Sequence, residues 1–122
     1  MIAEIATMFC LTTMIYNETR GEPIKGKIAV AHVALNRIKK SKKDMCSVLH
    51  EPYQFEMRLP SKYARQSPAW EDAHIFASLV INGKTVDPTK VATHFHAHYV
   101  NPSWNKIFTH TATIGGHKFY KQ

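Results

Sequence analysis

The sequence has few of the features that would place it outside the ordinary globular proteins. It has 122 residues, two cysteines and five glycines. No apolar run approaches the roughly 18 residues of a spanning helix, and we find no internal repeat, linker or low-complexity segment. These absences exclude a disulfide-stapled mini-domain and stable membrane insertion. With 44% hydrophobic residues, the chain is expected to form one domain over residues 1–122.

Acidic residues are also scarce, because nine of them face sixteen lysines and arginines. The net charge of +7 favours a polyanionic partner such as nucleic acid, an acidic membrane surface or the bacterial cell wall. Lys39, Lys40, Lys42 and Lys43 best support a basic nucleic-acid-binding module. No helix-turn-helix, RNA-binding aromatic motif or zinc finger accompanies them. We therefore expect these lysines to face water or the wall, with no nucleic-acid partner, and keep the nucleic-acid module as an alternative.

Two further signals concern the compartment in which the chain works. Cys10 and Cys46 are not in a CxxC or other ligand spacing, so we expect two buried free thiols, with a disulfide as the alternative. The chain begins with Met-Ile-Ala-Glu rather than with a basic segment. We therefore expect no secretory signal peptide and synthesis in the cytoplasm.

Apolar spacing predicts a body of helices. Residues 2–17 carry two apolar stripes, which predicts a buried central helix that ends near Gly21. A second helix is expected to begin at Pro23, and a short third helix to follow Asp44 as its cap. A fourth is expected to begin at Pro68, with Ser67 as its cap, and to end at Asn82-Gly83.

The last third of the chain has a different pattern. From Asp87 on, β-branched and aromatic residues alternate with polar ones, in "ATHFHAHYV" and "HTATIGGHKFYK". This pattern predicts short strands or extended loops, with a turn at Gly115-Gly116. Together with the helical body, it predicts an α+β fold.

The stretch "IYNETRGEP" places two of the few acidic residues around an Arg-Gly pair. Glu18 falls in the last turn of the first helix, where the negative helix end and apolar neighbours both raise the pKa of a carboxyl. Glu22 falls at the start of the next helix, whose dipole favours the ionised form. Such a pair is typical of a site that protonates a glycosidic oxygen. The structural alternative is that Glu22 caps its helix and pairs with Arg20, while Glu18 is a satisfied helix-end residue.

Four blocks of sequence carry a family resemblance: "IYNETRGEPIKGKIAVAHVALNRI", "DMCSVLHEPYQFEM", "DPTKVATHFHAHYVNPSW" and "TATIGGHKFYK". In this order they resemble the SleB-type cell-wall hydrolases, the family of spore cortex-lytic enzymes and some phage endolysins. The resemblance covers nearly the whole chain. It implies a lysozyme-like, predominantly helical fold and cleavage of the glycan strand of peptidoglycan. It places the family's catalytic glutamate at Glu18 and makes Glu22 a supporting residue beside Arg20.

The family is associated with lytic transglycosylase chemistry, which needs one carboxyl and leaves a 1,6-anhydro-muramic acid end. We therefore expect Glu18 to protonate the oxygen between N-acetylmuramic acid and N-acetylglucosamine, and then to accept a proton from the C6 hydroxyl. A hydrolytic muramidase of the same fold would need a second carboxylate, for which Glu56 and Asp87 are the nearest candidates. Hydrolysis stays an alternative.

A glycan cleft needs hydrogen-bonding groups and a surface on which a sugar ring can stack. Gln54, Thr93, His94, His96 and Trp104 lie in the family blocks and offer both. Because one residue separates His94 from His96, an extended segment would place both side chains on one face. Core packing is the alternative for Trp104.

The third histidine of this segment suggests a different chemistry. His94, His96 and His98 could share one face and bind zinc, as in a zinc-dependent amidase. No HExxH helix or remote carboxylate ligand accompanies them, so we expect no metal and no cofactor.

We expect this enzyme to be a monomeric phage endolysin. The short chain, which shows no wall-binding module and no export signal, motivates that setting, in which the enzyme would reach the wall or periplasm with the help of a holin. A spore germination enzyme is the alternative.

Overall fold

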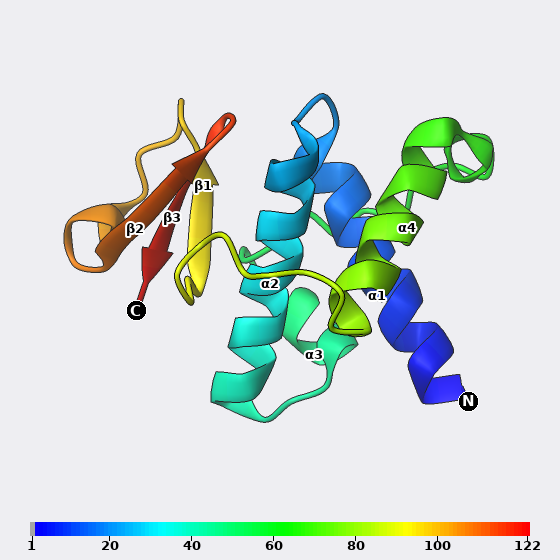
Figure 1. Ribbon diagram of the computed structural model, residues 1–122, viewed down its shortest axis with the longest axis horizontal. Coiled ribbons are helices and arrows are strands. Elements are labelled where there is room, and N and C mark those ends of the chain that lie inside the picture. The colour runs from blue at the N-terminus through cyan, green and yellow to red at the C-terminus, as the bar shows by residue number, and fades with distance from the viewer. Residues whose placement is uncertain (1) are drawn as a thin grey trace.

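The computed structural model describes residues 2–122, with side chains from residue 4 onward. Helices come first along the chain and strands last (Figure 1). The elements are α1 (Ile2–Thr19), α2 (Ile24–Ser41), α3 (Met45–Leu49), η1 (Ala64–Gln66), α4 (Pro68–Ile81), β1 (His94–Ala97), η2 (Ser103–Lys106), β2 (Thr109–Ile114) and β3 (His117–Lys121). The predicted α+β, predominantly helical architecture is confirmed.

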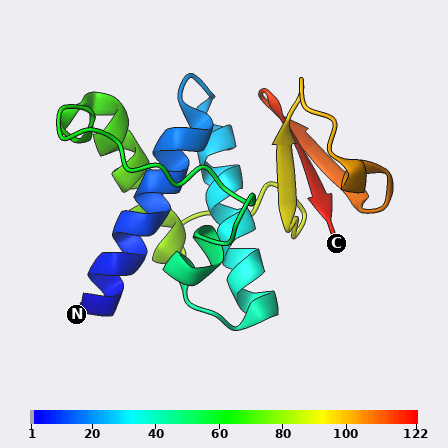
Figure 2. The same cartoon turned by 180° about the vertical axis from the view of Figure 1, so that it is seen from behind.

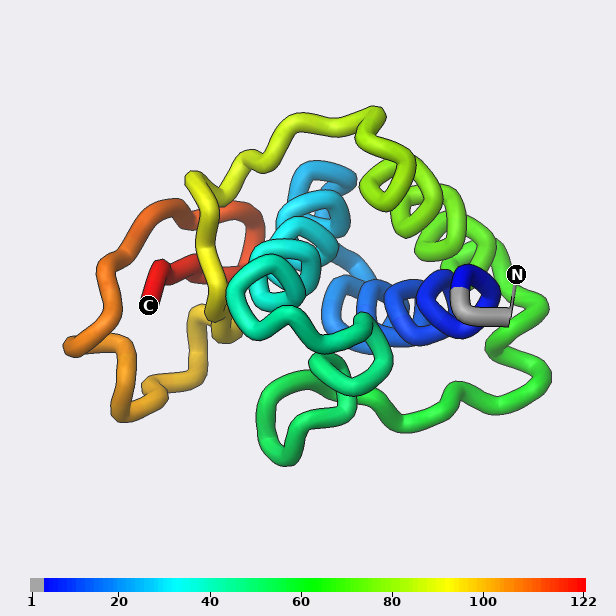
Figure 3. Tube along the Cα trace, turned by 90° about the horizontal axis from the view of Figure 1, so that it is seen from below, coloured from blue at the N-terminus to red at the C-terminus, as the bar shows by residue number. Residues whose placement is uncertain are grey.

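Helix α2 lies between the small sheet and the pair formed by α1 and α4, as the front and back views show (Figures 1 and 2). The view from below shows the same order, with the sheet on one flank of α2 (Figure 3). The strands are antiparallel in the order β1-β3-β2. His94 of β1 lies opposite Tyr120 of β3. The fold thus brings the histidine-rich strand to the side of the helical body.

The helix boundaries follow the local signals of the sequence. Gly21 follows α1 with a φ of +81°, a conformation that suits glycine after a helix. The side chain of Asp44 accepts the Ser47 amide at 3.0 Å, and Ser67 Oγ accepts the Trp70 amide at 3.3 Å. Pro23 is the N-cap residue of α2 and not its first helical residue, a one-position difference that lies within the usual scatter of helix ends.

The core lies where the long helices meet. Leu11, Met14 and Ile15 of α1 are fully buried. The facing positions of α2 and α4 are mostly alanine and valine, whose small side chains let the helices approach closely. Phe119 of β3 is also fully buried and joins the sheet to this core. Burying an aromatic side chain of this size contributes about 2–3 kcal/mol.

The prediction that α1 is a buried central helix is wrong for its N-terminal half. Ile5 is 68% exposed and Phe9 43% exposed, whereas the positions from Cys10 to Tyr16 are buried. The apolar stripes identify the face of the helix that is buried, but they do not show how much of its length the other helices cover. The first turns of α1 project beyond the helical body (Figure 1). Neither α1 nor any other described helix is long and apolar enough to cross a bilayer.

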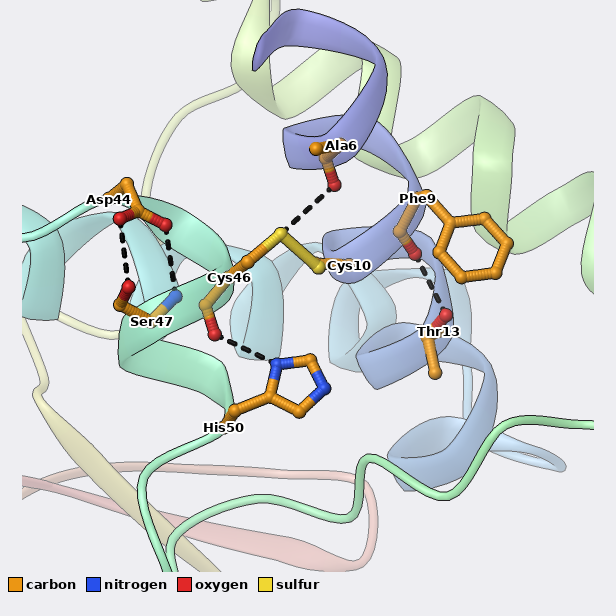
Figure 4. Close-up of a disulfide and its surroundings, with 8 residues drawn as sticks. All are labelled: Ala6, Phe9, Cys10, Thr13, Asp44, Cys46, Ser47 and His50. Atoms are coloured by element: carbon orange, nitrogen blue, oxygen red, sulfur yellow. Dashed lines mark hydrogen bonds between the residues drawn. A yellow bond between two sulfur atoms is a disulfide. The ribbon is translucent and has the colours of Figure 1, made fainter. Parts of the chain in front are cut away.

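The expectation of two free thiols is also wrong, because Cys10 and Cys46 form a disulfide (Figure 4). Packing of α3 against α1 places the Cα atoms of the two cysteines 5.5 Å apart, inside the range that a disulfide can span. The two cysteines are 36 positions apart, so only the packing of the helices reveals the pair. The bond ties α1 to the short helix that precedes residues 50–60.

We expect loss of this disulfide to destabilise the fold. Closing a loop of this length contributes about 2–4 kcal/mol by restricting the unfolded chain. Urea unfolding of the Cys10→Ser/Cys46→Ser protein should give a free energy of unfolding lower by that amount, and a reducing agent should lower the wild-type value similarly. The reducing agent should leave the double variant unaffected, which serves as the control. Equal unfolding midpoints for oxidised and reduced wild type would contradict this expectation.

Candidate active site

Glu18 lies in the last turn of α1 and is half-buried. Its Oε2 accepts a hydrogen bond from the Glu56 amide at 3.2 Å. Burial raises the pKa of Glu18, the bond from the Glu56 amide acts in the opposite sense, and the nearby Glu56 carboxylate raises the pKa further. The net shift is upward, in the direction that the sequence predicted, so the carboxyl holds its proton to a higher pH than an exposed glutamate would.

The end of α1 is held by its neighbours on two sides. The side-chain amide of Asn17 donates to the carbonyl oxygens of Glu56 at 3.0 Å and Arg58 at 2.8 Å. The ammonium group of Lys27 donates to the carbonyl oxygen of Thr19 at 3.0 Å, where a cation complements the negative helix end. These bonds fix the backbone on which Glu18 is carried. Sequence reasoning missed Asn17 and Lys27, although Asn17 directly precedes Glu18.

Glu22 connects the helical body to the sheet. Its Oε1 accepts the Gly116 amide at 2.8 Å and lies 3.8 Å from Nδ1 of the buried His117. A Cβ at Gly115, where φ is +57°, would collide with the same carboxylate oxygen, so the β2–β3 turn needs glycine there. The Glu22 carboxylate is therefore engaged with the turn.

Arg20 does not take part in the Glu22 contact. Its Nη1 donates to Tyr16 Oη at 2.8 Å, and its guanidinium lies 5.0 Å from the centre of the Tyr16 ring. The alternative in which Glu22 caps α2 and pairs with Arg20 is therefore not what the structure shows. The N-cap residue of α2 is Pro23, which makes no side-chain cap bond, and the Glu22 carboxylate binds the β2–β3 turn instead.

Four of the five residues predicted to hold sugar line one cavity of about 210 Å³. We call this cavity the aromatic pocket; its walls include Arg37, Gln54, Phe55, His94, His96 and Trp104. The fifth predicted residue, Thr93, is buried and contacts the pocket indirectly, through the bond between its hydroxyl and His94. Glu18 is bonded to the residue that follows Phe55, so the carboxyl lies where the 55–56 segment leaves the pocket.

His94 presents a neutral ring to the aromatic pocket. Burial lowers its pKa to about 4, and the charges of Arg37 and Lys40 lower it in the same direction. The Thr93 hydroxyl accepts the Gln122 amide at 3.0 Å and lies 3.0 Å from Nδ1 of His94. The neutral ring has one donor and one acceptor nitrogen, and Nδ1 is the nitrogen bonded to the Thr93 hydroxyl.

His96 and Trp104, two walls of the pocket, also belong to an aromatic cluster. His96 is 8% exposed, with Nδ1 bonded to the Ala97 carbonyl oxygen at 2.8 Å and Nε2 to Tyr120 Oη at 3.1 Å. Trp104 is half-buried, and its ring lies 5.2 Å from that of His94 and 5.7 Å from that of His96. Both residues therefore form the wall, and the two bonds of His96 hold the cluster in place.

Arg37 organises the pocket and was missed by sequence reasoning. Its guanidinium donates to the Thr93 carbonyl oxygen at 3.2 Å and to Gln54 Oε1 at 3.1 Å, and it pairs with Glu51 at 3.3 Å. It also lies 5.2 Å from the centre of the Phe55 ring. One cation therefore connects α2, the 51–55 segment and Thr93, the residue before β1. In the sequence it lies in the first family block but is one of several basic residues on a helix.

The two candidates for a second carboxylate have different surroundings. Asp87 accepts hydrogen bonds from Asn36 and from the Thr89 hydroxyl and amide, so it stabilises the connection that precedes β1. Glu56 is exposed and accepts the Arg58 amide at 3.1 Å, yet its backbone contacts Glu18. Of the two, only Glu56 contacts Glu18.

The three histidines considered for zinc do not act as one group. His94 and His96 line the aromatic pocket, while Nδ1 of the exposed His98 lies 3.3 Å from the Gly116 carbonyl oxygen. Among the residues whose side chains are described, no cluster of three or more histidine, cysteine, aspartate or glutamate side chains is placed to hold a metal ion.

The lysines at the end of α2 and in the loop after it are all exposed, as the sequence predicted. They are Lys39, Lys40, Lys42 and Lys43. Lys43 makes an ion pair with Glu51 at 3.4 Å, and Lys42 ends the helix with a φ of 60°.

Comparison with known proteins identifies the class. Residues 21–120 match the family described as Cell Wall Hydrolase, and the chain therefore belongs to that family. The matched range begins at Gly21, so Glu18 lies just before it. The predictions that this chain is an enzyme and that its family is the SleB-type cell-wall hydrolases are confirmed.

Two solved structures of that type are similar to this one. The catalytic domain of the germination-specific lytic transglycosylase SleB from Bacillus anthracis is 27% identical, with a TM-score of 0.76, over 94% of this chain and 93% of that one. The catalytic domain of the Bacillus cereus SleB protein is also 27% identical, with a TM-score of 0.73, over 94% of this chain and 89% of that one. A search of curated proteins found no significant match. The lysozyme-like fold prediction is confirmed.

The surroundings of His94 predict an unusual titration. Its pKa of about 4 is lower than the value of about 6.5 for an exposed histidine. Because only the unfolded chain takes up a proton between these two values, His94 should make the fold less stable as pH falls through that range. NMR titration should show the neutral ring down to about pH 5, and the urea-unfolded chain serves as the control. A folded-state midpoint at or above 6.5 would contradict the structure.

Proposed function

We propose that this protein cleaves the bond between N-acetylmuramic acid and N-acetylglucosamine in peptidoglycan, with Glu18 as the catalytic acid. The observation that carries the proposal is the half-buried Glu18 carboxyl, whose pKa is raised and which is fixed to the 55–56 segment beside the aromatic pocket. A general acid works best when it is still protonated near the working pH. Protonation of the bridging oxygen weakens the glycosidic bond.

The aromatic pocket offers what an N-acetylated sugar needs. The Trp104 ring provides a surface on which a sugar can stack, and the neutral His94 ring provides a hydrogen-bonding nitrogen for a hydroxyl or acetamido group. The guanidinium of Arg37 holds Gln54 in the wall of the pocket. His96, also in the wall, is held by Tyr120, and Thr93 supports His94.

We further propose lytic transglycosylase chemistry. Glu18 gives its proton to the bridging oxygen, and the bond from that oxygen to the anomeric carbon of muramic acid breaks. The resulting carboxylate then takes the proton of the C6 hydroxyl, whose oxygen bonds to the anomeric carbon and closes the 1,6-anhydro ring. Atoms and charge balance without a water molecule or a second carboxylate. The Bacillus anthracis SleB protein, described as a lytic transglycosylase, supports this choice.

The engagement of the other nearby carboxylates also favours the transglycosylase. Glu22 is held by the β2–β3 turn and Asp87 by the connection before β1. Glu56 accepts the Arg58 amide, on the same segment that contacts Glu18. A hydrolytic muramidase would need one of them free, with a separation that leaves room for a water molecule or a covalent bond. Glu56 is the one that such an enzyme would use.

The proposed acid can be tested by one substitution. Glu18→Gln should lower the rate of peptidoglycan cleavage by about 10²–10⁴-fold, because the amide cannot supply the proton. Glu71→Gln, on the exposed first turn of α4, is the matched control and should retain the wild-type rate. A Glu18→Gln protein that clears wall material at the full rate would exclude Glu18 as the acid.

Mass spectrometry of the released muropeptides identifies the reaction. Anhydro-muramic acid ends are expected, and reducing ends would instead establish a hydrolase. Release of peptides from intact glycan strands would identify an amidase, and loss of that activity in EDTA with recovery in zinc would identify a zinc enzyme.

We also propose that the protein is a phage endolysin that reaches the wall from the cytoplasm. Support for action on the wall comes from the Cell Wall Hydrolase family, to which the chain belongs. Expression in bacteria without a holin should leave the culture turbid, and co-expression with a holin should lyse it. Glu18→Gln with the holin is the control for lysis by the holin alone. Rapid lysis by the enzyme without a holin would contradict this route.

A further inference from the structure

A second cavity lies beside the end of α1. Its volume is about 420 Å³, and its walls include Tyr16, Asn17, Arg20, Glu56, Arg58 and Ser61. We call it the basic pocket. The chain passes directly from Phe55, a wall of the aromatic pocket, to Glu56, a wall of the basic pocket. Since the Glu56 amide donates to Glu18, the Glu18 carboxyl contacts the segment that joins the two cavities.

Two arginines dominate the charge of the basic pocket. One N–H of the Arg20 guanidinium donates to Tyr16 Oη, and the guanidinium lies over the Tyr16 ring. These two contacts fix the position of Arg20. The only carboxylate in the wall is that of Glu56, and it lies 4.0 Å from Nε of Arg58. The described residues provide no hydrogen-bond acceptor for the terminal nitrogens of Arg58, whose side chain is 83% exposed. The pocket therefore contains two guanidinium groups with free donors and one carboxylate.

Such an arrangement suits a carboxylate ligand. A guanidinium group binds a carboxylate through two parallel hydrogen bonds, and an arginine held in advance loses less freedom on binding. Ser61 adds a hydroxyl to the same wall, although that oxygen also accepts the Ala64 amide at 3.0 Å. Asn17 adds no donor, because both of its bonds go to the 56–58 segment.

We propose that the basic pocket binds a carboxylate of the peptide stem that peptidoglycan carries on muramic acid. This inference rests on the proposed function, since it takes the muramic acid residue to be bound beside Glu18. The lactyl group of that sugar bears the stem, and the stem carries free carboxylates at its acidic residues and at its C-terminus. A stem that leaves the sugar at Glu18 enters the adjoining cavity. The enzyme would thereby prefer glycan strands that retain their peptides.

The test compares two substrates prepared from the same purified peptidoglycan, freed of wall polymers. One is the intact material, and the other has had its stems removed by an amidase. The measured quantity is the ratio of kcat/KM on peptide-bearing strands to kcat/KM on peptide-free strands. For the wild type this ratio should exceed one. For Arg20→Gln/Arg58→Gln it should fall by about tenfold, mostly through a higher KM on the peptide-bearing strands.

Lys62→Gln is the matched control, because it removes a cation from an exposed residue next to Ser61 that does not line the cavity. Its ratio should equal that of the wild type. Arg58→Gln alone is the second variant and should lower the ratio in the same direction. Because the Arg58 side chain is 83% exposed, we expect its removal to leave the fold intact. Thermal unfolding of each variant checks the fold.

The outcomes separate this inference from the proposed function. A wild type that cleaves neither substrate at the glycosidic bond would overturn the proposed function. A wild type that cleaves both, with the same ratio in the wild type and in both arginine variants, would overturn the basic pocket alone. Equal loss on both substrates would show that the arginines bind the glycan and not the stem, which would also overturn it.

Discussion

The C-terminal end of α1 is the point on which the rest of the structure depends. Within six residues it contacts the 56–58 segment through Asn17 and Glu18, the start of α2 through Thr19 and Lys27, and the sheet through Glu22. Each of these bonds pairs a backbone amide or carbonyl group at a helix end, a loop or a turn. The same bonds set the position of the carboxyl that we propose as the acid.

A half-buried carboxyl is costly, and the fold limits that cost without removing it. Burial disfavours the charged form of Glu18, and one amide hydrogen bond partly compensates the charge. A fully satisfied carboxylate would titrate like an ordinary surface group and would be a poor acid near neutral pH. The disulfide from α1 to α3 adds stability close to the segment that closes over Glu18, so the fold can tolerate an unfavourable group there.

Much of the helical body could be predicted from local signals. The caps at Asp44 and Ser67, the glycine after α1 and the apolar spacing of α2 each depend on neighbouring residues, and each was found as expected. His94, His96, Gln54 and Trp104 could be selected because they lie in family blocks, and they line one cavity. Arg37 lies in the first family block and Arg58 just after the second, but a basic residue has no local feature that shows which cavity it will reach.

The sequence by itself determined the family, the order of the elements and the identity of the carboxyl at the end of the first helix, because these follow from motifs and short-range periodicity. Only the tertiary structure decided that Cys10 and Cys46 are bonded, that half of α1 is uncovered and that Glu22 turns to the sheet. These features depend on contacts between residues far apart in the chain. The burial that raises the pKa of Glu18 also exists only in the folded chain.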